Sequence, residues 1–190
     1  MKSLNSFLFL SLLSLNFIVQ GQNYLNEQKV VANDRERFSG GLGSDVAINF
    51  NQILAGAYWE DKDSVGVDSV KRAGAIYIYE LQNTGKWSQV QKLVHSDRNS
   101  DDELGESLAS HGKYMVAGME GYGSDGGAFL FKRGGDRKWT EVDSYEPADG
   151  FTLGTDVSIF DDFVLVSDEL NQKDENDQNY MAAAGAVYIL

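Results

Sequence analysis

The stretch AGAIYIY, residues 73–79, has the alternating pattern of a β-strand. Related stretches recur as GGAFLFK at 126–132 and AGAVYIL at 184–190. The first of these strands opens with Ala73 and Gly74, where small residues allow another backbone to approach closely. A pattern that returns three times in one chain predicts a repeated supersecondary unit.

The two faces of the first of these strands are both apolar. Ile76 and Ile78 are expected on one face, and Tyr77 and Tyr79 on the other. A strand that is apolar on both faces is typical of a sheet covered on both sides.

A second motif recurs with the same phase and marks the start of each unit. It reads LGSDVAINFNQILAGA from Leu42, LGESLASHGKYMVAGM from Leu104 and LGTDVSIFDDFVLVSD from Leu153. The step from its first glycine is thirteen residues in every unit, as Gly43 to Gly56, Gly105 to Gly118 and Gly154 to Ser167. Such a constant step favours a structural repeat over coincidence.

Each motif reads as a hairpin of two strands. The links FNQ at 50–52, HGK at 111–113 and FDD at 160–162 are expected to be tight turns, with Gly, Asn or Asp where a positive φ is needed. The strand of the AGAIYIY type is the third of the unit, and a fourth begins at Trp87 and again at Trp139.

The two ends of the chain carry parts of a further unit. QKVV at 28–31 echoes QKLV at 91–94 in the fourth strand, so the chain is expected to begin on a fourth strand and to end on a third. Units of four antiparallel strands suggest an all-β fold built of β-propeller blades, here incomplete or split. A β-sandwich is the rival, but it gives no reason for a repeat in this phase.

These motifs resemble the FG-GAP repeats of the integrin α-subunit N-terminal propeller and of many secreted bacterial proteins. The likeness covers 22–190, with repeats at about 28–90, 91–142 and 143–190. Where that family usually has Phe-Gly, this chain has Leu-Gly in each unit. Where the family has Gly-Ala-Pro, the chain has Gly56-Ala57-Tyr58, Gly118-Met119 and Ser167-Asp168.

Composition agrees with strands and narrows the range of partners. The chain has 20 Gly and one Pro in 190 residues, which suits many strands joined by tight turns. A net charge of −13 repels phosphate backbones and anionic lipid surfaces, so nucleic acid is not an expected partner. The chain has no cysteine, which excludes disulfides and a thiol nucleophile.

The first 21 residues read as a secretory signal peptide. Lys2 precedes an apolar run from Phe7 to Val19, and the small residue Gly21 follows. This run is too short to span a bilayer, so a mature chain starting at Gln22 and a secreted or cell-surface location are expected.

The link between the second and third strands varies in length on an otherwise constant frame. It takes eighteen residues from Gly56 to Gly74, nine in the second unit and eighteen in the third. Loops that vary on a constant scaffold are common places for binding. The two long links, 58–72 and 168–180, are acidic.

The resemblance implies that such loops can hold Ca²⁺. Asp61, Asp63 and Asp68, with Gly66, approximate the family's ligand pattern, although Val65 stands where a carboxylate would be expected. The third unit offers Asp174, Asn176 and Asp177 without the glycine. Solvated acidic loops that bind no metal are the alternative.

The chain shows no recognisable catalytic motif. Gly121, Gly123 and Gly126 form a literal GxGxxG, but a strand follows where a nucleotide site needs a helix. His95 and His111 have no matched acid and nucleophile nearby in sequence. Trp87 and Trp139 occupy equivalent positions and are expected to fill seams between blades.

We therefore expect a non-enzymatic module that binds a protein or glycan ligand, in the manner of an adhesion domain. The alternative is an accessory propeller of a larger secreted enzyme whose catalytic domain lies elsewhere. Two units with partial ones cannot close a ring alone. Either the chain is a fragment, which is the favoured expectation, or copies assemble through exposed blade edges.

Overall fold

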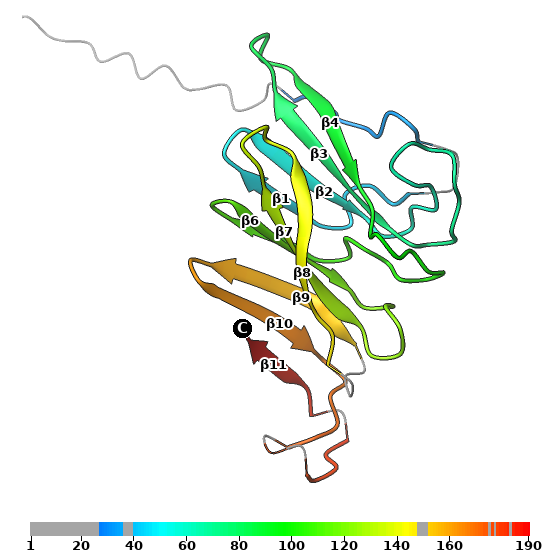
Figure 1. Cartoon of the computed structure of the whole chain (residues 1–190), viewed down its shortest axis with the longest axis vertical. Coiled ribbons are helices and arrows are strands. Elements are labelled where there is room, and N and C mark those ends of the chain that lie inside the picture. Colours follow the sequence, from blue (N-terminus) through cyan, green and yellow to red (C-terminus); the bar gives the residue numbers. More distant parts are fainter. Residues whose placement is uncertain (1–26, 36–39, 148–151, 175, 177, 183) are drawn as a thin grey trace, which may run out of the picture.

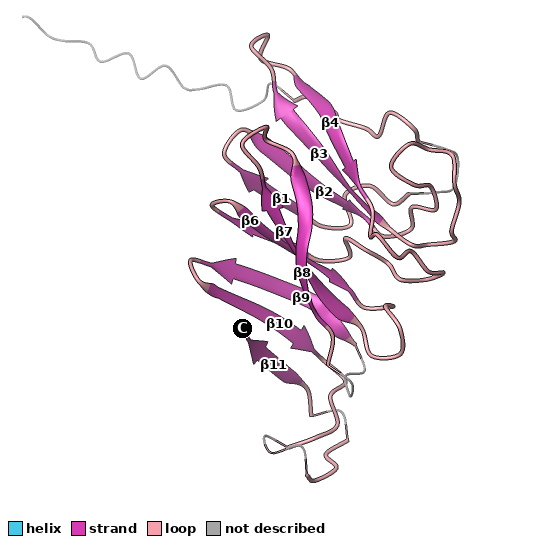
Figure 2. Ribbon diagram, in the orientation of Figure 1, coloured by secondary structure: helices cyan, strands magenta, loops and turns pink. Residues whose placement is uncertain are grey.

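The fold consists of three antiparallel β-sheets stacked one on another (Figure 1). The computed structural model describes residues 27–35, 40–147, 152–174, 176, 178–182 and 184–190. Every regular element in this part of the chain is a strand (Figure 2). Within the same residues, no helix is long and apolar enough to cross a membrane. The predicted signal peptide, 1–21, and the predicted mature start at Gln22 lie outside them.

The three sheets follow one another along the chain and share one topology. The first contains β1 (Val46–Asn49), β2 (Gln52–Ala57), β3 (Ala75–Leu81) and β4 (Trp87–Leu93). The second contains β5 (Leu108–His111), β6 (Tyr114–Met119), β7 (Gly127–Arg133) and β8 (Trp139–Tyr145). The third contains β9 (Leu153–Phe160), β10 (Phe163–Asp168) and β11 (Ala186–Ile189). The predicted all-β class and the order of strands in partial propeller blades are confirmed, and none of the sheets is closed.

The core has three clusters: two lie in the seams between the sheets, and the third lies on the outer face of the first sheet. Ile76 and Ile78 pack with the cluster between the first and second sheets, whereas Tyr77 and Tyr79 belong to a cluster on the opposite face. All four side chains are buried, as the alternation predicts. Trp139 is 1% exposed and fills the first seam, as expected.

The seams bring backbones into direct contact at glycines. A Cβ atom built at Gly56 would lie 1.9 Å from the carbonyl oxygen of Gly105, in the turn that leads into the second sheet. The same relation holds between Gly118 and Gly154, again at 1.9 Å. Because any side chain would collide with backbone here, the recurring glycine is required by the spacing of the sheets.

A second close approach of two backbones occurs just before β3 and again just before β7. Gly74 has a φ of +80° and pairs in a parallel bridge with Leu104, whose backbone nitrogen would lie 2.2 Å from an added Cβ. Gly126 and Leu153 repeat the bridge at the second seam. The predicted role of the small residues before the third strand is therefore confirmed.

Two sequence predictions need correction. In the first hairpin the residue with positive φ is Phe50, at +51°, and not the neighbouring asparagine. The corresponding residues of the other hairpins are Gly112 and Asp161. The register, which pairs Asn49 with Gln52, places the strained position directly after the first strand and so selects Phe50.

The second correction concerns residues 28–31, which were predicted to form a fourth strand. They are described but form no strand. A strand requires a neighbouring strand for its hydrogen bonds, and no third strand of the same blade lies beside this segment. Its place on the first sheet is instead maintained by side chains.

Candidate functional site

The connecting loops gather at one end of the sheets, on the right and at the bottom in Figure 1. We call this end the loop rim and define it as the described residues of 58–74, 94–107, 120–126 and 169–185. Backbone bonds join the first two of these loops, as the amides of Asp101 and Glu103 donate to the carbonyls of Lys71 and Arg72. The frame of the rim is therefore set by the backbone.

Ion pairs strengthen the same junction. Arg72 Nε lies 2.6 Å from Asp101 and its Nη1 lies 3.0 Å from Glu103. Lys71 contacts Asp101 at 3.1 Å. Hydrogen bonds from Lys71 and Arg72 lower the pKa of Asp101. Because these groups are solvent-accessible, water screens the charges and each pair contributes little to stability.

The long loop of the first blade contains the three predicted metal ligands. Asp63 Oδ1 accepts the backbone N–H groups of Val65 at 3.1 Å and of Val67 at 2.8 Å. Asp61 Oδ1 accepts the N–H of Arg72 at 2.7 Å. Asp68 contributes its carbonyl oxygen, which accepts the N–H of Asp63 at 2.8 Å. Hydrogen bonds from Val67 and its neighbours lower the pKa of Asp63.

The long loop of the third blade has the same hydrogen bonds. Asp174 Oδ1 accepts the N–H groups of Asn176 at 3.1 Å and Gln178 at 2.9 Å, and the N–H of Asp174 donates to Asn179 at 3.1 Å. Hydrogen bonds to its carboxylate from the Gln178 N–H, the Asn179 side chain and the Asn176 N–H lower the pKa of Asp174 to about 2. Sequence reasoning grouped Asp174 with Asn176 and Asp177 as ligands but missed its equivalence to Asp63. Asp177 lies outside the described residues.

The three carboxylates predicted to hold calcium, Asp61, Asp63 and Asp68, take different roles in this loop, and the calcium site stays a prediction. Within the described residues, no three His, Cys, Asp or Glu side chains form a group that could hold a metal ion. Arg98 also contacts this loop, because its guanidinium donates to the carbonyl oxygens of Asp61 and, at 3.5 Å, Asp68. The third-blade loop has the same backbone hydrogen bonds, although Gln172 and Asn179 stand at the positions of Asp61 and Asp68.

Large apolar side chains project from the loop rim. Val65 is 76% exposed and Val67 is 82% exposed, at the tip of the first long loop. Trp59 is exposed at the base of the same loop, where its ring lies 5.0 Å from that of Tyr58. Tyr180 is exposed on the third-blade loop. The loop rim therefore exposes apolar side chains on both of its long loops.

Several carboxylates of the loop rim influence one another electrostatically. Burial, followed by the carboxylates of Glu120 and Glu103, raises the pKa of Glu106 to about 7. Burial also raises the pKa of Glu103. Glu169 of the third-blade loop adds a further negative charge near Glu106. This part of the rim therefore carries a negative field that favours a cationic or neutral partner.

A buried ionic group in the first blade was not found by sequence reasoning. Lys92 Nζ lies 2.6 Å from Asp34 and 3.3 Å from Glu60. The hydroxyl oxygen of Tyr77 lies 2.9 Å from an oxygen of each carboxylate, and its single proton is donated to one of them at a time. Burial raises the pKa of Asp34, but the bonds from Lys92 and Tyr77 outweigh it and lower the pKa overall. The only signal in the sequence was a lysine in an otherwise half-apolar strand.

The comparison with known families agrees with this architecture. Residues 87–131 match the FG-GAP repeat family. The chain contains an FG-GAP repeat. The matched residues run from β4 into β7 and include Gly105 and Gly118, each of which makes a close backbone contact at a seam. A search of curated protein sequences finds no match.

Proposed function

We propose that this FG-GAP chain is a secreted, non-enzymatic binding module whose ligand is a protein held at the loop rim. The observation that carries the proposal is the exposure of Val65 and Val67 at the tip of a loop whose backbone is held by Asp63. A loop ordered before binding loses little entropy when it contacts a partner. The apolar tip then contributes favourable burial.

The chemistry of the tip favours protein over glycan. Valine side chains have no hydrogen-bonding group with which to recognise sugar hydroxyls, whereas apolar contacts are common at the centre of protein interfaces. Trp59 supports the second candidate, because its exposed ring beside Tyr58 could stack on a sugar. The acidic carboxylates around Glu106 favour a ligand with basic groups in either case.

The experiment is to probe an array of purified extracellular proteins and an array of oligosaccharides with the purified chain. A Val65→Ser/Val67→Ser variant removes the apolar tip, and Trp59→Ala removes the ring. Leu81→Ser, at an exposed position on the opposite end of the sheets, is the matched control.

We expect a protein ligand whose binding is lost in the double valine variant and retained in Leu81→Ser. Binding that depends on Trp59 and not on the valines would support a glycan ligand. No ligand on either array, or equal loss in the control, would contradict a binding role for the rim.

A further inference from the structure

The outer face of the third sheet has the same kind of apolar side chains as the faces that pack in the seams, but no sheet among the described residues covers it. Leu165, Val187 and Ile189 occupy the positions of Leu54, Ile76 and Ile78 in the first sheet. The residues of the first sheet are fully buried in the first seam, whereas Val187 and Ile189 are 64% and 69% exposed. Phe160 and Phe163 extend this exposed face, which we call the β11 face.

The opposite end of the stack carries the other half of such a seam. Val46, on β1, corresponds to Leu108 of the second sheet, which is buried in the first seam, but Val46 is 62% exposed. Ile48 beside it is also exposed. Figure 1 shows β11 at one end of the stack and the first sheet at the other. The chain thus presents two complementary surfaces that face away from each other.

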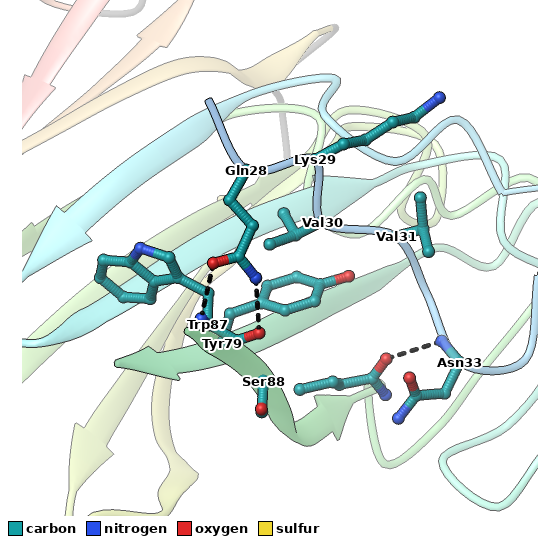
Figure 3. Close-up of a pocket in the computed structure, with 9 residues that line it drawn as sticks. Gln28, Lys29, Val30, Val31, Asn33, Tyr79, Trp87 and Ser88 are labelled. Atoms are coloured by element: carbon teal, nitrogen blue, oxygen red, sulfur yellow. Dashed lines mark hydrogen bonds between the residues drawn. The ribbon is translucent and has the colours of Figure 1, made fainter. Parts of the chain in front are cut away.

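Residues 28–33 cover part of that opposite end in a recognisable way. Gln28 donates to the carbonyl of Trp87 and accepts from its N–H, both at 3.1 Å (Figure 3). Gln91 of β4 makes the same pair of bonds to Trp139, at 2.8 and 2.9 Å. Residues 28–31 therefore lie against the first sheet as β4 lies against the second.

A groove remains around this segment. It has a volume of about 380 Å³ and is lined by residues of the segment and by Tyr79, Trp87, Ser88 and Gln89. In Figure 3 the side chain of Val30 points toward Tyr79, and that of Lys29 points away from the first sheet. A fourth strand in a complete blade has this same division of side chains, since Leu93 of β4 packs in the first seam while Lys92 points to the other face.

We propose that a second copy of this chain covers these two surfaces, with residues 28–31 of each copy adding to β11 of the other. The occupant is specified by the equivalence of surfaces, because each copy holds both halves of the same seam. Two copies contribute six sheets, which is within the usual four to eight blades of a closed ring. A head-to-tail contact that closes after two copies has twofold symmetry.

The register follows from the complete blades. β3 pairs with β4 so that Ile76 lies opposite Leu93 and Ile78 opposite Gln91. The corresponding pairs between copies are Val187 with Val30 and Ile189 with Gln28. Lys29 would then lie beside Tyr188, as Lys92 lies 5.2 Å from the centre of the Tyr77 ring.

One residue keeps the contact between copies looser than the seams within a copy. Ser167 occupies the position that Gly56 and Gly118 hold in the first two sheets. At those two glycines, a carbonyl oxygen from across the seam lies in the space that a Cβ atom would fill. Gly43 of the second copy would supply that carbonyl. The Cβ of Ser167 therefore requires the sheets to separate locally, which weakens the association without changing the register.

A designed disulfide tests the register directly, because the chain has no cysteine of its own. In the full chain, Val30→Cys with Val187→Cys places the two sulfurs on opposite strands of the proposed pair. Val31→Cys with Val187→Cys is the control, shifted by one residue. After mild oxidation, light scattering and non-reducing electrophoresis give the mass, and circular dichroism checks that each variant remains folded.

The expected result is a covalent dimer from the Val30/Val187 variant and little from the shifted pair. Wild-type chain should be a dimer that dissociates on dilution. A monomer at every concentration, equal crosslinking in both variants, or a ladder of larger species would overturn the proposal.

The variant Ser167→Gly provides an independent measurement without cysteines. Removal of the Cβ should lower the dissociation constant of the dimer about tenfold, which corresponds to about 1.4 kcal/mol. An unchanged or higher dissociation constant would show that Gly43 of a second copy does not approach this point. Neither measurement uses the loop rim, so a failure here is distinct from a failure of the proposed binding role.

Discussion

The carbonyl oxygen of Gly105 lies only 1.9 Å from the position that a Cβ atom would take at Gly56. Gly154 and Gly118 repeat the relationship at the next seam. The distance between neighbouring sheets is thus set by two backbones in contact. A larger residue at Gly56 must separate sheets that bury Leu54 and Ile76.

We therefore expect Gly56→Ala to destabilise the chain by about 3 kcal/mol, the cost of forcing a methyl group into a packed seam. Gly135→Ala is the control, because an added Cβ there meets no atom within 4 Å. Urea denaturation followed by tryptophan fluorescence measures both. Equal stabilities for the two variants would contradict the backbone contact.

Gln52 connects the two sheets through a buried network. Its side chain is fully buried, accepts from the indole N–H of Trp139 at 2.9 Å and donates to Glu80 at 3.0 Å and to the carbonyl of Arg137 at 3.1 Å. Gln52→Leu leaves these groups without their partner, which should lower the free energy of unfolding by about 3 kcal/mol. Gln28→Leu, at an exposed pair of hydrogen bonds, should have a smaller effect. A loss as large in Gln28→Leu would show that burial does not set the cost.

Asp63 is expected to organise the first long loop through its oxygen and not through a metal. Asp63→Ala should speed hydrogen exchange of the Val65 and Val67 amides, whereas Asp63→Asn retains the acceptor and should leave them protected. Asp68→Ala is the control, because Asp68 contributes a backbone carbonyl. The thermal midpoint should be the same with calcium and with a chelator. A higher midpoint in calcium that Asp63→Asn abolishes would contradict this expectation and support the predicted metal site.

Glu106 should make stability depend on pH. Its pKa is about 7 in the folded chain, above its ordinary value of 4.5, so the folded state binds more protons than the unfolded state between these values. The free energy of unfolding should therefore fall as pH rises from about 4.5 to about 7 and then level off. Glu106→Gln should remove this part of the slope. Urea midpoints across this range measure it, and an unchanged slope in the variant would assign the effect to other groups.

Much of the fold could be predicted from particular residues. The alternation of Ile76 and Ile78 with Tyr77 and Tyr79 predicts the two buried faces of β3, because successive side chains of a strand point to opposite sides. The recurring glycines predict close backbone approach. Trp139 was correctly expected in a seam because a residue repeated in register indicates a packing requirement.

Less of the candidate site could be predicted from the sequence. Asp61, Asp63 and Asp68 were recognised as neighbours in sequence, but which atoms each would contact depends on how the loop folds back. Arg98 comes from a different connection and reaches the carbonyls of Asp61 and Asp68 only after two sheets have packed. The sequence around Arg98 contains no pattern that indicates this contact.

The sequence by itself determined the strands, their order and the phase of the repeat, because these depend on side-chain alternation and on turns between residues close along the chain. The tertiary structure alone decided that Gly56 meets Gly105 and that Lys92 joins Asp34 and Glu60 in a buried group. It also placed Ser167 on the β11 face, which no other sheet covers among the described residues. These relationships join segments far apart in sequence, and they are fixed only by the distance and angle at which one sheet packs on the next.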